Sequence, residues 1–223
     1  MFQRYAIYYT PSGALAEVGA SWLGWDIKTG THVPHPVIDG LDVAALTHRP
    51  RKYGLHGTIK APFALADGTT EAMLTQDFEA LCARLAPVAF TGLETHPIGP
   101  FIALAPIGDQ TGLGQLAANV VTALDRFRAP LSEAELARRR RSNLTPSQDN
   151  NLMAWGYPYV MEDFRFHMTL TGRIKDNMAT VDAALHMYFL PHVPHPFTID
   201  TLTLTGQGED GMFYEIRRVA LNG

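Results

Sequence analysis

The sequence predicts an α+β fold in which one structural unit occurs twice. A histidine begins the unit each time: His56 opens a series of strand, helix, strand and strand, and His167 opens a second series in the same order. The third element of each series starts with a Phe-Thr pair, at Phe90, 34 residues after His56, and at Phe197, 30 residues after His167. Two such units can pack about an approximate twofold axis, which would bring the two histidines face to face.

In the first half of the chain, aromatic and β-branched runs alternate with helical patterns, and glycine or proline ends most of them. Residues 28–50 are the exception, because their content of Gly, Pro and His predicts a loop or short irregular structure. The pattern predicts, in order, a strand at 4–11 stopped by Pro11, a helix at 14–24, a strand at 52–63 ended by Pro62, a helix from about Glu71 to Leu85, and two strands within 88–108 around a turn at Pro97, Gly99 and Pro100.

The second half begins with helical patterns. Residues 112–128 predict one helix and residues 131–141 another, for which Ser132 and Glu135 form a capping box. The remaining elements are irregular structure or a short helix at 142–163, a strand at 164–174 that gives the clearest strand signal of the chain, a helix from about Asn177 to Phe189, and strands at 196–206 and 212–221. The expected organisation is a single bilobal domain over 1–223, with repeat units at about 50–106 and 164–221 and a helical insertion at about 107–163.

Composition excludes several classes of protein. No apolar run approaches the ~20 residues of a membrane helix, and Met1 to Tyr9 carries Arg4 and lacks the apolar core of a signal peptide. We therefore expect a cytoplasmic protein with no membrane partner. Cys82 is the only cysteine, which excludes an internal disulfide and a cysteine-rich zinc site, and its helical surroundings indicate a small core residue.

The charges favour a small anionic ligand. A formal net charge of −4 argues against general coating of nucleic acid, so RNA is the less favoured partner. The positive charges are nevertheless clustered, because 11 of the 18 Lys and Arg lie in three groups: Arg49, Arg51, Lys52 and Lys60; Arg138 to Arg141; and Arg165, Arg173 and Lys175.

Each repeat places a histidine and a threonine on one strand face. Residues i and i+2 of a strand project to the same side, so His56 and Thr58 point together, as do His167 and Thr169. Two imidazoles and two hydroxyls in one cleft suit phosphodiester chemistry without a metal. A neutral histidine takes a proton from water, a protonated histidine supplies one to the leaving oxygen, and hydroxyls and cations hold the other phosphate oxygens.

Two His-x-Thr matches alone are weak evidence, because chance supplies roughly one His-x-Ser/Thr match in a chain of this composition. For each histidine taken alone, a partly buried residue that closes strand hydrogen bonds is the favoured interpretation. Their equivalent positions in the repeat, beside basic clusters, favour the catalytic interpretation. The sequence HVPHP, at 32–36 and 192–196, indicates proline-rich loops, because its proline prevents helical placement of the histidines and no carboxylate or cysteine cluster accompanies it. We therefore expect no metal.

Further side chains are candidates for substrate binding. Lys60 and Arg173 follow the two histidines by four and six residues, close to the expected cleft. Tyr157 and Tyr159 either stack on a sugar or base or pack under the second lobe. The arginines 138–141 spread around a predicted helix, so they either form a solvated face or supply one or two contacts to a phosphate.

The motifs HGTI (56–59) and HMTL (167–170) resemble the paired His-x-Thr-x motifs of the two-histidine (2H) phosphoesterase superfamily. The wider segments KYGLHGTIKAPF and WGYPYVMEDFRFHMTLTGR resemble a branch often encoded among phosphonate-degradation genes. The resemblance implies two pseudo-twofold-related antiparallel sheets with helices outside and a central cleft. It also implies catalytic His56 and His167, phosphate-binding Thr58 and Thr169, no cofactor, and a cyclic phosphate of phosphorylated ribose as substrate.

The expected function is therefore a metal-independent phosphoesterase that opens a cyclic phosphodiester on a small ribose-containing substrate. Two alternatives stay open at this point. One is processing of RNA 2′,3′-cyclic phosphate ends or 2′-5′ ligation by the same site, and the other is a non-catalytic module that binds a phosphorylated metabolite. The sequence leaves the oligomeric state, and which histidine is the acid, undecided.

Overall fold

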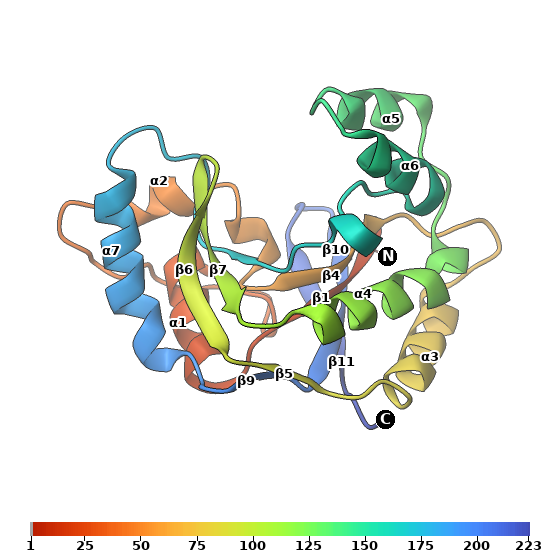
Figure 1. Cartoon of the computed structure of the whole chain (residues 1–223), viewed down its shortest axis with the longest axis horizontal. Helices are drawn as coiled ribbons and strands as arrows, with labels where there is room; N and C mark the ends of the chain where they lie inside the picture. The colour runs from red at the N-terminus through yellow and green to blue at the C-terminus, as the bar shows by residue number, and fades with distance from the viewer. Residues whose placement is uncertain (1) are drawn as a thin grey trace.

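A computed structural model describes residues 2–223 and shows a mixed helix and sheet fold (Figure 1). Its centre is a seven-stranded antiparallel sheet with the order β11-β10-β1-β4-β8-β7-β6. The strands of this sheet are β1 (Arg4–Tyr9), β4 (Gly57–Phe63), β6 (Gly92–Ile98), β7 (Phe101–Ile107), β8 (Met168–Thr169), β10 (Thr201–Gln207) and β11 (Phe213–Ala220). Two short pairs lie outside it: β2 (Trp25–Asp26) with β3 (Thr31–His32), and β5 (Val88–Phe90) with β9 (Phe197–Ile199).

Seven α-helices accompany these strands in residues 2–223. They are α1 (Gly13–Leu23), α2 (Val43–Thr47), α3 (Glu71–Cys82), α4 (Thr111–Ala123), α5 (Glu133–Arg140), α6 (Pro146–Trp155) and α7 (Met178–Phe189). Four 3₁₀ turns add to them, including η1 (Arg51–Tyr53) just before β4 and η3 (Met161–Asp163) before β8. None of the helices described is long and apolar enough to cross a membrane.

The two faces of the sheet are used differently. Along β1, Ile7 and Tyr9 belong to the large core, which also contains the buried side chains of α1, α3, α4 and α7. Tyr8 points to the other face, where it packs in a small cluster with Trp25 and Phe213. The helices of the large core therefore cover one face, and most of the other face is left for a cleft.

Helices from each half of the chain pack against strands from the other half. Helix α7, from the second predicted unit, contacts β6 of the first, while α3, from the first unit, contacts β10 and β11 of the second. The corresponding strands β5 and β9 pair with each other in antiparallel fashion, with Ala89 opposite Thr198. A duplicated unit arranged about a twofold axis would have this topology; the boundaries of the units remain a prediction.

The predicted pair of sheets is a single hydrogen-bonded sheet whose halves meet where β4 pairs with β8 through Gly57 and Met168. The strand predicted at 164–174 is much shorter than expected. Its ladder to β7 is interrupted, because the amides of Leu170 and Thr171 both donate to the carbonyl of Ile102, at 2.9 and 3.2 Å. The Trp22 indole donates to the carbonyl of Leu170 at 2.8 Å, which ties α1 to the end of β8.

Other elements differ in detail from the sequence prediction. Strand β4 starts only at Gly57 and continues through Pro62 to Phe63, while the loop predicted at 28–50 contains β3 and α2. The capping box predicted for α5 is half formed, because Ser132 accepts from the Glu135 amide but the Glu135 carboxylate binds arginines instead. A complete capping box begins α6, between Thr145 and Gln148.

Candidate active site

A cleft of about 580 Å³ lies over the junction of β4 and β8, on the face of the sheet to which Tyr8 points. Its walls come from distant parts of the chain: the turn between β6 and β7 at Pro100 and Phe101 forms one side, and α5 forms the other. These two segments rise from the sheet on opposite sides of the view in Figure 1. The cleft therefore lies between the first repeat's hairpin and the predicted insertion.

His56 stands immediately before β4, and its ring is fixed by a local turn. Gly54, with a φ of +64°, places its carbonyl 3.0 Å from Nδ1 of His56. A carbonyl only accepts, so Nδ1 carries the proton and Nε2 of the neutral ring is left as an acceptor. The Thr58 hydroxyl lies 3.2 Å from this Nε2 and donates to it.

His167 repeats this arrangement before β8. Its Nδ1 lies 3.0 Å from the carbonyl of Arg165, again two residues earlier in the chain, so Nε2 is the atom left for the cleft. Because Gly57 pairs with Met168 in antiparallel register, His56 lies across from Thr169, and Thr58 lies across from His167. All four side chains project from one face, and all four line the cleft.

The environment of His56 favours its neutral form. The Tyr8 ring is stacked with its centroid 4.0 Å from that of His56, and the Tyr53 ring lies at 5.6 Å. Desolvation by this packing is the main cause that lowers the pKa of His56 to about 4; the hydrogen bond to Gly54 opposes the shift, and His167 adds to it. His56 is thus an unprotonated base throughout the neutral range.

The structure brings most of the predicted binding residues to the cleft. Arg173 and Tyr157 line it. Tyr159 does not; it is 42% exposed and packs edge-on against Tyr157 with centroids 5.6 Å apart. Of the arginine run, Arg138 and Arg139 line the cleft, whereas Arg140 binds Asp149 outside it.

The placement predicted for Lys60 is wrong. Thr58 pairs with Tyr8, but Lys60 pairs with Ile7, so β4 contains one extra residue between these pairs. Because Ile7 and Tyr8 point to opposite faces, this bulge turns Lys60 away from the cleft and toward α4. There its buried ammonium donates to the Val121 carbonyl at 3.1 Å and to Asp125 at 3.3 Å. Desolvation lowers its pKa to about 8, and Asp125 opposes the shift.

Sequence reasoning missed several residues of the cleft. Two of them belong to the first strand: Tyr8 lies between Ile7 and Tyr9, which gave it no distinguishing signal, and Arg4 is the first residue of that strand. Arg49 and Lys52 belonged to a recognised basic cluster, and their closeness to His56 in sequence was the signal that could have assigned them. Phe101, whose ring centroid lies 5.9 Å from that of His167, comes from the hairpin turn and gave no sequence signal.

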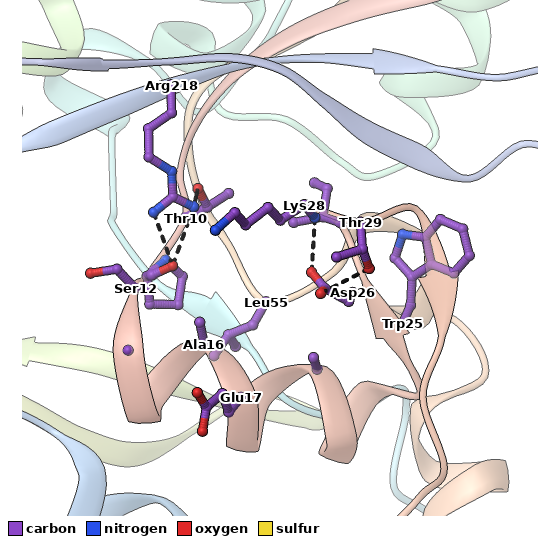
Figure 2. A pocket seen from close by; sticks show the side chains of 14 residues that line it. Thr10, Ser12, Ala16, Glu17, Trp25, Asp26, Lys28, Thr29, Leu55 and Arg218 are labelled. Atoms are coloured by element: carbon purple, nitrogen blue, oxygen red, sulfur yellow. Dashed lines mark hydrogen bonds between the residues drawn. The ribbon is translucent and has the colours of Figure 1, made fainter.

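A second cavity, of about 290 Å³, lies between the start of α1 and the segment around β2 (Figure 2). Several of its polar groups already have partners: Arg218 donates to the Thr10 hydroxyl at 2.7 Å and pairs with Glu215, and Asp26 accepts from the amide of Lys28 and the hydroxyl of Thr29. None of the predicted site residues lines it. The cleft at the histidines is therefore the candidate site.

The HVPHP segments do not converge on a metal site. His35 accepts from the Arg51 guanidinium at 2.9 Å, and His195 contacts the carbonyl of Thr91 at 3.3 Å. Across residues 2–223 no three His, Cys, Asp or Glu side chains lie close enough together to hold a metal ion.

Comparison with known proteins places the chain among its relatives. The family model described as "Protein of unknown function (DUF1045)" matches residues 58–214, well over half of the chain. A protein of Janthinobacterium sp. (strain Marseille) named ribose 1,5-bisphosphate phosphokinase PhnN is 38% identical over 99% of this chain and 51% of its own length. One of the same name from Laribacter hongkongensis is 35% identical over 78% of this chain and 41% of its length. The chain thus spans about half the length of the curated relatives it matches.

A solved structure with the same fold is E. coli LigT complexed with 3′-AMP. Its sequence is 14% identical to this chain, the match covers 100% of each chain, and the TM-score is 0.50. At this level of identity the likeness is evidence for the fold alone. The fold expected from the two-histidine resemblance is confirmed by this likeness. With its fold and its sequence match together, the chain belongs to the DUF1045 family and is built on the fold of the two-histidine phosphoesterases.

Proposed function

We propose that this protein is a phosphoesterase that opens a cyclic phosphodiester of a small ribose-containing substrate by acid/base catalysis between His56 and His167. The observation that carries the proposal is the matched placement of the two rings. Each fixes Nδ1 on the carbonyl two residues earlier and leaves Nε2 for the same cleft, opposite the other repeat's threonine. A purely structural role for each histidine would not explain why both Nε2 atoms are directed to the same cleft.

The different surroundings of the two histidines support different roles. With a pKa of about 4, His56 is neutral at pH 7, so its Nε2 can take a proton from an attacking water. The hydroxyl of Thr58 holds this Nε2 before the water arrives. His167 is less enclosed and, when protonated, donates its Nε2 proton to the leaving ring oxygen as the P–O bond breaks.

The reaction balances without a further reactant. Water adds its oxygen to phosphorus, one proton goes to His56, and the bond from phosphorus to one ribose oxygen breaks as that oxygen receives a proton from His167. The product is a phosphate monoester and a free hydroxyl, and exchange with solvent restores both histidines. The Thr58 and Thr169 hydroxyls and the Arg173 guanidinium are placed to hold the non-bridging oxygens.

The names of the curated relatives support a particular substrate. They contain the compound ribose 1,5-bisphosphate. Opening the 1,2-cyclic phosphate of ribose 5-phosphate at its bond to O2 yields this compound, which fits a role beside a kinase in phosphonate metabolism. No glycine in this chain is followed by lysine, so the sequence does not contain the lysine-containing P-loop that holds nucleoside triphosphates in many kinases.

The experiment that tests the proposal follows ring opening by phosphorus NMR with excess chelator present. The panel contains ribose 1,2-cyclic phosphates and nucleoside 2′,3′-cyclic phosphates, with wild type, His56→Ala and His167→Ala, and with His96→Ala as a control because His96 is exposed on β6 and outside the cleft. We expect both cleft variants to lose about 10²- to 10⁴-fold in turnover and the control to keep it.

Other results would select the alternatives. Preference for nucleoside 2′,3′-cyclic phosphates would favour RNA end processing. Turnover that chelator removes would contradict a mechanism based on protein groups alone. Tight binding of these compounds by folded wild type without any turnover would leave a module that binds a phosphorylated metabolite.

A further inference from the structure

The cleft carries more positive charge than one cyclic phosphate requires. Among its twenty lining residues there is no Asp or Glu, although the whole chain has a net charge of −4. Six lining residues are cationic: Arg4, Arg49, Lys52, Arg138, Arg139 and Arg173. A cyclic phosphodiester has a single negative charge, so a concentration of cations on this scale is complementary to a ligand with at least two phosphoryl groups.

Five of the six cations lie in two groups, and the sixth, Arg4 of β1, donates to Gln207 at 2.7 Å. Arg49 precedes η1 and Lys52 lies within it, just before His56, and Arg173 follows β8, so these three belong to the end of the cleft with the histidines. Arg138 and Arg139 come from α5 on the opposite wall, beside Tyr157. In Figure 1, α5 and α6 project together from the rest of the molecule.

In the second group, Arg139 has the more ordered side chain and the better placement for binding a phosphate. Its side chain is only 16% exposed, its guanidinium lies over the Tyr157 ring at 5.4 Å, and one terminal nitrogen donates to Glu135 at 3.0 Å. These contacts fix the side chain, yet its Nε is buried without a hydrogen-bond partner. An ordered guanidinium with a free donor is ready to bind a phosphate oxygen with little loss of conformational entropy.

A second unpartnered donor lies at the histidine end of the same cleft. In residues 2–223, three buried side-chain polar atoms lack a partner, and two of them belong to residues of this cleft: Nε of Arg139 and the hydroxyl of Tyr8. Buried donors without partners are uncommon in folded proteins, and at a cleft they indicate groups that a ligand satisfies. Arg138, by contrast, is 66% exposed and contributes charge alone.

We infer that the cleft has a second phosphate subsite, in which Arg139 of α5 binds a non-reacting phosphate monoester of the substrate while its cyclic phosphate lies between His56 and His167. This inference rests on the proposed function and narrows it to a substrate with two phosphoryl groups. It also gives the helical insertion a role, which is to select that substrate.

The test compares two substrates that differ only in the second phosphate: ribose 1,2-cyclic phosphate with and without a 5-phosphate. We expect wild type to prefer the 5-phosphorylated compound by about 10- to 100-fold in kcat/KM. Arg139→Gln should lose most of that preference and keep the kcat/KM of wild type on the compound without a 5-phosphate. Arg141→Gln is the matched control, because Arg141 is exposed at the end of the same helix and does not line the cleft.

Equal losses on both substrates in Arg139→Gln, or a wild type without preference, would overturn the subsite. A binding measurement keeps it testable if wild type turns over neither compound. Ribose 5-phosphate, which carries only the second phosphate, should bind wild type, His56→Ala and Arg141→Gln alike in calorimetry and bind Arg139→Gln at least about tenfold more weakly. Equal binding by all four proteins would reject the subsite, and turnover by wild type decides the proposed function separately.

Discussion

Removing an aromatic ring that packs against His56 should expose its imidazole to water and raise its pKa. Desolvation is the main cause that lowers this pKa to about 4, and Tyr53, with its ring centroid 5.6 Å from that of His56, is the partly exposed half of the packing that causes it. We therefore expect Tyr53→Ala to move the pKa of His56 toward 6.5. At pH 5.5 a group with a pKa of 4 is about 97% neutral, whereas one with a pKa of 6.5 is about 9% neutral.

The assay is a titration of the histidine ring nitrogens by ¹⁵N NMR, assigned by comparison with His56→Gln, which needs no substrate. The same spectra report the tautomer, and His56 should carry its proton on Nδ1. In turnover, the acid limb of wild type should lie near pH 4 to 5, and Tyr53→Ala should be up to about tenfold less active at pH 5.5 relative to pH 8. Tyr159→Ala, which removes an exposed tyrosine outside the cleft, should change neither curve. A wild-type His56 that titrates at 6.5 would refute the argument that packing by Tyr8 and Tyr53 desolvates this ring.

Three further predictions follow from the residues around the site. The free energy of unfolding should fall as pH decreases from 6.5 to 4, because unfolded His56 takes up a proton that the folded protein excludes, and urea denaturation of His56→Gln should show a weaker dependence over this range. Gly57→Ala should cost about 1–3 kcal/mol of stability and reduce turnover, because its Cβ would overlap the Phe166 ring beside His167; a thermal melt unchanged from wild type would contradict this. Lys60→Met should leave turnover unchanged and should reduce the rise in stability between pH 8 and 10.5, where the unfolded lysine holds a proton that the buried one has lost; a turnover deficit in this folded variant would restore Lys60 to the site.

The four residues at the centre of the cleft could be predicted because their placement depends only on strand geometry. Alternation puts His56 with Thr58 and His167 with Thr169, and the antiparallel pairing of Gly57 with Met168 brings the two pairs together, as expected for a twofold arrangement. Neither step needs side-chain packing, which is the part of a structure that local sequence does not determine. The helices around the sheet were predictable for a similar reason, since their apolar spacing is local.

The errors arose where tertiary contacts decide the outcome. Lys60 is two residues after Thr58, so regular strand alternation would put both side chains on the same face. The bulge opposite Ile7 and Tyr8 turns Lys60 to the other face. The strand after Phe164 has the composition of a long β-strand but pairs over only two residues, because the carbonyl of Ile102 accepts two amides at its end. Bulges and irregular ladders depend on the partner strand, so a pattern within one segment cannot predict them.

The two histidines share one backbone arrangement, and the acid/base catalysis proposed for them needs their surroundings to differ. The sheet shows where the difference arises. Thr58 is paired with Tyr8 of β1, while its counterpart Thr169 is paired with Ala103 of β7. The tyrosine ring at the first position stacks on His56 with centroids 4.0 Å apart, whereas the second position holds only a methyl group and the nearest ring to His167 is Phe101 at 5.9 Å. A large residue on the flanking strand therefore contributes to the desolvation of His56, and the backbone arrangement that holds both rings need not change.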